Sequence, residues 1–523
     1  MTVTLPNECF GNILIFLDIK TLYKCLFINR YFCKLSIPII WRDPFILTNS
    51  KKSCNRIPLI NTLLACLDED EVSSLIPCVI KFNNKTPLFE YGEFIKKIDH
   101  KRIIECIITW LEETNGRNFL SLIEKSNYGV EPNYEKDCRV RKLIDAIYHM
   151  IMRKSSSLQE FIIIISENYI NLPKPSIFTT YQPGISNLRS LNITNSLNFI
   201  NDNDTKYHNI MEFLIMVSKF CNCIISSHTC VSSLKIIFKI SEIVKLQPLK
   251  RISINNCNFN NRNVEYSRKI LYNLKFRSET LKELIFDSFN FRLIDISFIL
   301  ELKNLEYLEF NQCVFFYQQF LNKEKLQLKE LKLVNCETPS TKAIIESLCN
   351  ETLVKLTLNI EDVGTAIAIK EYCSNINILN AKFPSYLFFD LIVPHICELS
   401  SLKILSIYFI EYRGNYKDQL IKMFGDYLVK VDYLFLNFDI ELSSFEYFIN
   451  NCKANLKKLI LTINNDSLRK DYLLCVNNFQ NVHNSLKVLE IKKYGKEFCW
   501  TREEIKIIDL LKNQDIITFL SYE

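Results

Sequence analysis

Glycine is scarce in this chain of 523 residues: it occurs nine times, and no two glycines lie closer than eleven positions apart. Phosphate-binding loops and the nucleophile elbow of hydrolases need closely spaced glycines, because their backbone turns sharply or approaches a phosphate. The sequence accordingly contains no G-x-G-x-x-G, G-x-x-x-x-G-K or G-x-S-x-G motif. The enzyme classes that depend on these motifs are excluded.

Long apolar runs are also missing. The most apolar stretch, from Phe161 to Ile165, suits a buried strand, whereas a membrane-spanning helix needs about 20 apolar residues. The N-terminal residues lack the basic and apolar regions of a secretory signal. We therefore expect a cytoplasmic or nuclear protein without a membrane segment, in which the 20 cysteines remain reduced thiols.

Clusters of like charge are short. The formal net charge is +6, from 64 basic and 58 acidic residues, and the basic clusters are pairs such as Lys96-Lys97 and Lys457-Lys458. A nucleic-acid-binding protein concentrates its basic residues on one face or in longer runs. We interpret the charge as a solvated surface and expect no nucleic-acid partner.

A six-residue unit, apolar-x-x-apolar-x-apolar, recurs in the C-terminal two thirds of the chain. Its clear copies begin at Leu249, Leu281, Leu305, Leu328, Leu353, Leu402, Val431, Leu456 and Leu486, with a weaker copy at Ile376. From Leu281 onward the starts lie 23 to 30 residues apart, which is the period of leucine-rich repeats. The second and third apolar positions are two residues apart, so both point to the same side of a strand.

These repeats predict an α/β solenoid, with parallel strands on a concave face and helices on a convex face. Earlier repeats are predicted at Leu158 to Ile163 and Leu188 to Ile193, a loop from Asn201 to Asn209, and a buried helix over residues 210–225. Leu234 to Ile240 is predicted as a further strand.

Three repeats carry a cysteine eight residues after the unit begins: Cys257, Cys313 and Cys336. Leucine-rich repeats commonly place Asn or Cys there, where a small group can donate to the backbone of the turn. The placement resembles the cysteine-containing repeats of F-box proteins. These side chains could equally be ordinary buried thiols, which is compatible with the repeat.

Three short helices are predicted in the first 45 residues. Pro6 suits a helix start, and apolar residues then recur at helical spacing. Pro38 is expected to interrupt the third segment. The three apolar sets are Cys9, Phe10, Ile13, Phe16 and Leu17; Leu22, Cys25, Leu26 and Ile28; and Phe32, Leu35, Ile39, Ile40 and Trp41.

This segment resembles an F-box. The family pattern begins Leu-Pro-x-Glu, matched by Leu5, Pro6 and Glu8, and continues through Leu22 and Cys25. It then has an Ile-Asn-Arg-x-Phe segment (residues 28–32) and closes with Leu35-Ser36 and Ile40-Trp41. The alternative is a helical cap on the solenoid, since repeat arrays need end caps. We divide the chain into an F-box (1–45), a helical linker (46–155) and a leucine-rich-repeat solenoid (156–523).

The resemblance implies a substrate-recognition adaptor of a Skp/cullin/F-box-type ubiquitin ligase, a non-catalytic subunit that needs no cofactor. Its partners would be a Skp-type adaptor protein and an unidentified target protein. The expected adaptor-binding residues are Leu5, Pro6, Ile13, Leu17, Leu22 and Leu26. The expected target-binding residues alternate with the buried strand positions: Arg251, Glu283, Asp287, Tyr307, Glu309, Glu330, Lys332, Lys355, Tyr408, Tyr433 and Phe435.

Two other functions stay open. One is a leucine-rich-repeat interaction scaffold that acts outside ubiquitin ligation. The other is an enzyme with a metal site at Cys221, Cys223, His228 and Cys230, although structural zinc sites usually show two separate C-x(2–4)-C pairs. Buried thiols are the favoured interpretation of this cluster, and no metal site is predicted. Asp68 to Glu71 is interpreted as a solvated turn or helix start.

Overall fold

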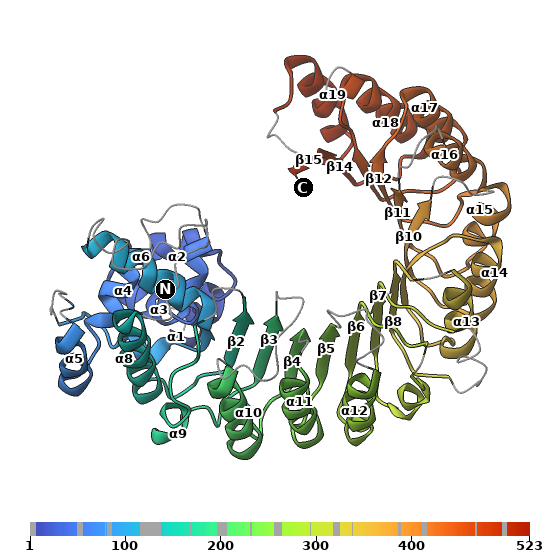
Figure 1. The fold of residues 1–523 in the computed structure, drawn as a ribbon. Helices are drawn as coiled ribbons and strands as arrows, with labels where there is room; N and C mark the ends of the chain where they lie inside the picture. The colour runs from blue at the N-terminus through green and yellow to red at the C-terminus, as the bar shows by residue number, and fades with distance from the viewer. Residues whose placement is uncertain are drawn as a thin grey trace, which may run out of the picture. The chain divides into compact units, whose positions relative to one another are not determined.

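The computed structural model describes residues 7–49, 56–78, 80, 86–115, 137–166, 170–195, 207–230, 233–255, 264–292, 294–316, 325–336, 338–384, 389–410, 416–465, 468–493 and 499–522. They belong to two compact units, Met1–Leu281 and Lys282–Glu523. Both units are α/β, with parallel strands that alternate along the chain with helices or turns (Figure 1). The predicted repeat of strand and return segment is confirmed at this level.

The first unit begins with three short helices, as the apolar spacing predicts: α1 (Asn7–Leu14), α2 (Ile19–Cys25) and α3 (Arg30–Ile40). Asp18 caps α2, because its Oδ1 accepts a hydrogen bond from the backbone N–H of Thr21 at 3.0 Å. Asn29 caps α3 in the same way, accepting from the N–H of Phe32 at 2.9 Å.

The expectation that Pro38 interrupts the third helix is wrong. Pro38 lies inside α3, and the N–H of Trp41 still donates to the carbonyl of Ile37 at 2.9 Å. A proline in the last turn removes one N–H donor, but the chain beyond it can continue the helical hydrogen bonding.

The segment that follows is mostly helical, as predicted. It contains η1 (Pro44–Asn49), α4 (Arg56–Leu64), α5 (Glu69–Leu75), η3 (Ile76–Cys78), η4 (Tyr91–Phe94), α6 (His100–Asn115) and α8 (Cys138–Lys154). It also contains a strand, β1 (Lys97–Asp99), which pairs in parallel with β2 (Glu160–Ile165). The sheet therefore starts within the segment that was expected to be only a helical linker.

Within the described residues, three further strands and five helices complete the first unit: β3 (Ser190–Asn195), β4 (Ser226–Cys230), β5 (Arg251–Asn255), α9 (Ile177–Thr180), α10 (His208–Phe220), α11 (Leu234–Leu246), α12 (Val264–Leu274) and η8 (Lys275–Arg277). Strands β1 to β5 are paired in chain order and all pairs are parallel. The predicted strands at Leu158 and Leu188 are confirmed. The predicted helix over 210–225 is confirmed in its first part and ends at Phe220.

The prediction of a strand from Leu234 to Ile240 is wrong, because this segment lies in helix α11. Its N-terminus is capped by Ser233, and the buried Ile236, Ile240 and Ile243 follow helical spacing. The strand of this repeat is β4, eight residues earlier in the chain. Its inward positions are Ser227 and Thr229, so it lacks the apolar signal on which the prediction depended.

The described residues of the second unit form ten strands: β6 (Glu283–Asp287), β7 (Tyr307–Asn311), β8 (Glu330–Val334), β9 (Lys355–Asn359), β10 (Ile378–Pro384), β11 (Ile404–Ile410), β12 (Tyr433–Asp439), β13 (Lys458–Thr462), β14 (Val488–Lys493) and β15 (Ile517–Tyr522). Each pairs in parallel with the next one in the chain. The predicted units from Leu281 to Leu486 all supply strands, including the weaker copy at Ile376.

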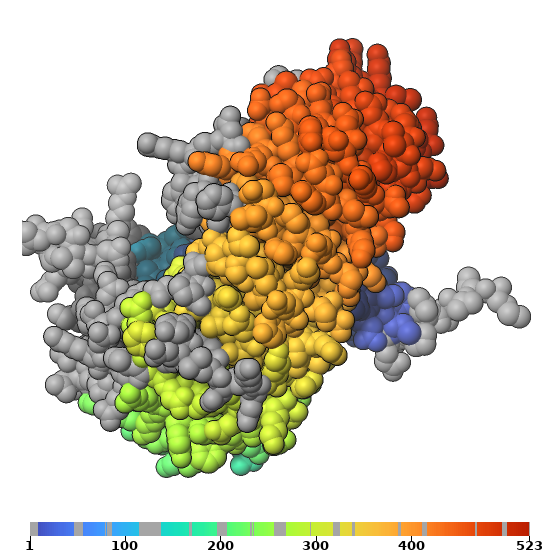
Figure 2. Space-filling model, turned by 90° about the vertical axis from the view of Figure 1, so that its right-hand side faces the viewer, coloured from blue at the N-terminus to red at the C-terminus, as the bar shows by residue number. Residues whose placement is uncertain are grey.

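Return segments connect these strands: η9 (Ser297–Glu301), α13 (Thr338–Leu348), α14 (Val363–Tyr372), α15 (Phe389–Cys397), α16 (Tyr416–Tyr427), α17 (Leu442–Asn451), α18 (Arg469–His483) and α19 (Arg502–Lys512). Helices α13 to α19 lie along one side of the sheet (Figure 1), and Figure 2 shows this side of the second unit in yellow to red. The apolar strand positions, such as Leu284 and Phe286, are buried beneath the return segments. Each such side chain stabilises the fold by about 1.5–3 kcal/mol.

The turns after three consecutive strands repeat the same backbone geometry. Ser288, Gln312 and Asn335 follow β6, β7 and β8, and all have positive φ angles, between 52° and 59°. Two of the three cysteines that lie eight residues after the start of a repeat unit are next to these turns. The thiols of Cys313 and Cys336 donate to the carbonyls of Phe286 and Phe310 in the preceding repeat, at 3.5 and 3.4 Å. The predicted role of a small donor at the turn is confirmed for these two; Cys257 lies outside the described residues.

Candidate binding surfaces

The three N-terminal helices share a small apolar core. Leu14, Leu22, Cys25 and Ile40 are buried in it, and partly buried apolar side chains pack around them. Leu17 and Leu26 belong to this surrounding group. Leu22, expected to contact an adaptor, is only 3% exposed and therefore supports the packing of the helices from within.

Large apolar side chains remain exposed where α1 and α2 end. Phe16 and Phe27 are 85% and 86% exposed. We use the name N-terminal apolar surface for two sets of exposed residues: Ile13, Ile15 and Phe16 at the end of α1, and Phe27 and Ile28 after α2. Side chains of this size are usually removed from water by folding or by a partner. Of the expected adaptor-binding residues, Ile13 belongs to this surface, and Leu5 and Pro6 lie outside the described residues.

Sequence reasoning missed Ile15 and Phe27 as surface residues and assigned Phe16 and Ile28 to the helical spacing of the core. All four lie in the turns that follow α1 and α2. Helical periodicity does not indicate which side a turn residue faces. Only a prediction of where each helix ends could have identified these four residues as exposed.

A pocket of about 340 Å³ lies beside these helices. Apolar and aromatic groups from α2, α3, η1 and α4 make up most of its lining. Trp41 is one of them, and its ring also packs on that of Tyr91, with 4.3 Å between the ring centroids. The lining residues are Tyr23, Ile40, Trp41, Pro44, Pro58, Leu59 and Thr62.

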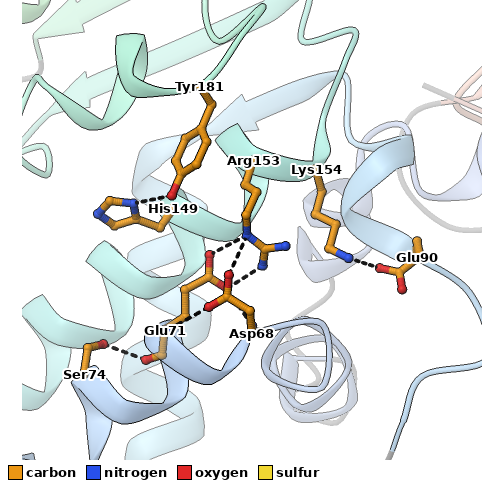
Figure 3. A network of polar contacts seen from close by, with 8 residues as sticks. All are labelled: Asp68, Glu71, Ser74, Glu90, His149, Arg153, Lys154 and Tyr181. Atoms are coloured by element: carbon orange, nitrogen blue, oxygen red, sulfur yellow. Dashed lines mark hydrogen bonds and ion pairs between the residues drawn. The ribbon is translucent and has the colours of Figure 1, made fainter.

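An ion-pair network joins α5 to α8 (Figure 3). Arg153, in the last turn of α8, donates to Glu71 from Nη2 at 2.7 Å and lies 2.9 Å from Asp68. Asp68 and Glu71 also form a capping box at the start of α5. The predicted helix start at Asp68 is thus confirmed, but Glu71 is 7% exposed and not solvated. Next to this pair on α8, Lys154 binds Glu90.

His100, at the start of α6, is a fully buried titratable group of the first unit. Its Nδ1 lies 2.8 Å from the hydroxyl of Tyr148, and its Nε2 lies 2.8 Å from the carbonyl oxygen of Ile170. A carbonyl only accepts, so Nε2 carries the proton and Nδ1 accepts from the hydroxyl of Tyr148. Burial lowers the pKa of His100 from 6.5 to about 4, which keeps the ring neutral.

In the second unit, the side of the sheet opposite the helices carries the residues that alternate with the buried ones. We call this side the strand face; its first, third and fifth positions run from Glu283, Ile285 and Asp287 on β6 to Ile517, Phe519 and Ser521 on β15. Ten of the expected target-binding residues lie on it. Arg251, the eleventh, is exposed on β5 of the first unit.

Ion pairs link the strand face from β7 to β9. Lys332 lies 3.7 Å from Glu309 and 3.8 Å from Glu330. Lys355 lies 3.0 Å from Glu330, and the hydroxyl of Tyr307 donates to Glu309. We call this group the charged ladder. Its acidic and basic side chains neutralise one another across neighbouring strands.

Aromatic rings and lysines lie close to one another on the strand face from β11 to β15. The rings of Tyr408 and Phe435 meet edge to face, with centroids 5.6 Å apart. The Nζ of Lys492 lies 4.6 Å from the centroid of Phe435, and that of Lys458 lies 5.6 Å from the centroid of Phe519. We call these five residues the aromatic–lysine patch.

The cysteine and histidine cluster around residue 221 is dispersed in the structure. The buried thiol of Cys221 donates to the carbonyl of Ile185 at 3.0 Å, whereas Cys223 is exposed. The Nδ1 of His228 lies 2.8 Å from Ser253 Oγ. Cys230 is disulfide-bonded, which corrects the expectation that every cysteine is a reduced thiol. Buried thiols therefore account for Cys221 but not for Cys223 or Cys230.

Among the residues that the structure describes, no group of three or more His, Cys, Asp or Glu side chains could hold a metal ion. Within the same ranges, no helix is both long and apolar enough to cross a membrane. In comparisons with known proteins, neither a protein-family model nor a curated protein matches this chain.

Proposed function

We propose that this chain is the substrate-recognition subunit of a Skp/cullin/F-box-type ubiquitin ligase. The N-terminal helices bind a Skp-type adaptor, and the strand face binds a target protein. The observation that carries this proposal is the N-terminal apolar surface, where Phe16 and Phe27 are more than four fifths exposed and do not belong to the helical core. Exposed apolar groups of this size are typical of protein-binding sites.

The chain supplies no reacting group in this proposal. Its contribution is to hold the target close to the ubiquitin-loading machinery, which raises the effective concentration of the reacting groups. The adaptor covers Ile13, Phe16 and Phe27 and reaches the partly buried Leu17 and Leu26. Leu22 acts from inside, because it holds α1, α2 and α3 in the geometry that presents these side chains.

The test is co-expression of the full chain with a Skp-type adaptor, followed by light scattering on a size-exclusion column. A stable one-to-one complex is expected. The double variant Phe16→Asp/Phe27→Asp should abolish the complex while its thermal unfolding stays unchanged, because both rings lie outside the core. Val482→Asp is the matched control: Val482 is 79% exposed on α18, and its replacement should leave the complex intact.

A folded wild-type chain that forms no complex with the adaptor would overturn the proposal. The N-terminal helices would then be a cap, and the chain a binding scaffold that acts outside ubiquitin ligation. If the complex forms, the half-life of a bound target after depletion of the chain separates the two functions. The target of a ligase subunit accumulates, whereas the partner of a scaffold keeps its half-life.

A further inference from the structure

The strand face of the second unit changes in charge along the array. From β6 to β9 it carries four carboxylates (Glu283, Asp287, Glu309, Glu330) and two lysines (Lys332, Lys355). From β10 to β15 it carries three lysines (Lys382, Lys458, Lys492) and two carboxylates (Asp439, Glu490). The acidic half contains the charged ladder, and the basic half contains the aromatic–lysine patch.

The basic half also carries a set of outward-facing aliphatic side chains, which we call the apolar floor. Isoleucines and a valine occupy outward positions on five of its strands, where solvated strands usually carry polar side chains. Ile517 is 64% exposed, and Tyr433 and Phe519 are each 39% exposed. The outward aliphatic residues are Ile378, Ile404, Ile460, Val488 and Ile517.

The two carboxylates of this half are both engaged. Glu490 lies 3.2 Å from Lys458 and accepts a hydrogen bond from Ser521 at 2.8 Å. Asp439 accepts from the backbone N–H of Asn464 at 3.2 Å, at the end of β12. Lys382 and Lys492 lie in the same outward row as Tyr408, near the carboxyl ends of their strands.

We propose that the aromatic–lysine patch binds an acidic, extended protein segment that carries an apolar side chain. Carboxylates of the segment pair with Lys492 of the patch and with Lys382 on β10, and its apolar side chain packs on Phe435 and on Ile460, which lies beside Phe435 in the register. Charge complementarity selects the acidic partner, and the apolar floor provides the anchor. The proposal names the class of target segment and rests on the proposed function for the assignment of this face to target binding.

The dimensions of the patch set the length of the segment. Neighbouring strands lie about 4.8 Å apart, so the five steps from β10, which carries Lys382, to β15 span roughly 24 Å. An extended chain covers about 3.3 Å per residue, so about seven residues cross these strands. A short linear segment is therefore sufficient.

The observations favour a protein segment over a nucleic acid. A phosphate backbone carries charge at regular short intervals and needs basic groups at a similar spacing, whereas Lys382 and Lys492 lie four strands apart. The outward aliphatic residues of this half cannot donate to phosphate. An apolar side chain flanked by carboxylates matches this surface better.

The test measures binding of a labelled peptide, in which glutamate and leucine alternate, to the full-length protein without any adaptor. Fluorescence anisotropy should show binding that weakens as salt is added. The comparison probes are a lysine–leucine peptide, a glutamate–serine peptide and a single-stranded oligonucleotide. All three should bind at least about tenfold more weakly, a difference of about 1.4 kcal/mol.

Two variants test the charged contacts and the apolar contact separately. Lys382→Glu/Lys492→Glu should weaken binding by more than about tenfold and reduce its salt dependence. Phe435→Ala should weaken binding to a similar extent but leave the salt dependence unchanged. The charge-matched control is Lys422→Glu/Lys430→Glu, which alters exposed lysines on and after α16 and should leave binding unchanged. Thermal unfolding confirms that each variant is folded.

The proposal is overturned if the glutamate–leucine peptide does not bind, if folded variants bind it as well as the wild type, or if the oligonucleotide binds more tightly and displaces it. Because the assay contains no adaptor, its failure is distinguishable from failure of the proposed function. A chain that binds the adaptor but not the peptide retains the ligase proposal and loses this one.

Discussion

Burial of a single histidine makes the stability of the first unit depend on pH. His100 is neutral in the folded protein, with a pKa of about 4, whereas its usual value is 6.5. Between these values the unfolded chain binds a proton that the folded protein does not bind. The first unit therefore keeps its full stability with respect to His100 above about pH 6.5. Its free energy of unfolding decreases progressively as the pH falls toward 4.

The size of this loss of stability follows from the difference between the two pKa values, which corresponds to about 3 kcal/mol. We predict that His100→Gln flattens the stability of the first unit between pH 6.5 and 4, measured by urea unfolding at several pH values. At neutral pH the variant should lose about 1–3 kcal/mol, because the hydroxyl of Tyr148 and the carbonyl of Ile170 lose well-placed partners. An unchanged pH profile in the variant would show that another group titrates.

Arg153 and Lys154 are adjacent on α8 but differ in the burial of their partners. Glu71 is 7% exposed, whereas the side chain of Glu90 is 51% exposed. We predict that Arg153→Met costs about 3 kcal/mol or more, because it leaves a buried carboxylate unpaired. Lys154→Met should cost less than about 1 kcal/mol, as exposed ion pairs do. Chemical unfolding of the two variants provides the comparison, and equal losses would contradict it.

At the scale of helices and strands, most of the second unit could be predicted from sequence, because one pattern marks each strand. The apolar-x-x-apolar-x-apolar unit located β6 to β14. It missed β15, where the register with β14 places Thr518 opposite Leu489. It missed β4 because Ser227 and Thr229 are its buried positions. Strand pairing tolerates polar residues at inward positions, and an apolar pattern cannot detect them.

The candidate sites were less predictable than the strands. Alternation along a strand placed ten target-binding candidates on the strand face of the second unit, but it did not separate the charged ladder from the aromatic–lysine patch. That difference depends on neighbours 23 to 31 residues away in sequence, such as Glu309 beside Lys332, and Glu490 beside Ser521. The exposure of Phe16 and Phe27 likewise depends on how α1 and α2 end.

A buried ion pair connects α18 to α19 near the C-terminal end of the array. Arg469 donates to Glu504 at 2.5 and 3.0 Å, and both side chains are almost fully buried. Burial alone would raise the pKa of Glu504, but the hydrogen bonds from Arg469 and Thr501 hold it below its usual value. The carboxylate is therefore charged in the folded protein.

Removal of one partner should cost more than removal of both. We predict that Arg469→Met destabilises the second unit by about 3–5 kcal/mol, because an unpaired carboxylate stays buried. Adding Glu504→Gln should restore part of this loss, since Gln keeps the capping box with Thr501 without the charge. Unfolding of both single variants and the double variant gives the coupling energy, and a strictly additive result would contradict a direct interaction.

At the scale of the whole chain, the division into two compact units predicts two unfolding transitions. Calorimetry should resolve them. His100→Gln should lower the midpoint of one transition, and Arg469→Met that of the other, because His100 bonds to Tyr148 in the first unit and Arg469 to Glu504 in the second. A single transition that both variants shift equally would show that the two units unfold together.

The pairing of strands in chain order has a mechanical consequence for the second unit. Tension along the array acts on every pair of neighbouring strands in series, so each pair experiences the same force. The pairs differ in strength, because the charged ladder joins β7, β8 and β9 through side chains as well as backbone. β15 is the last described strand of the array, so it pairs on one edge, with β14. Under load the array yields from that end first, one strand at a time, and the charged ladder is among the last parts to open.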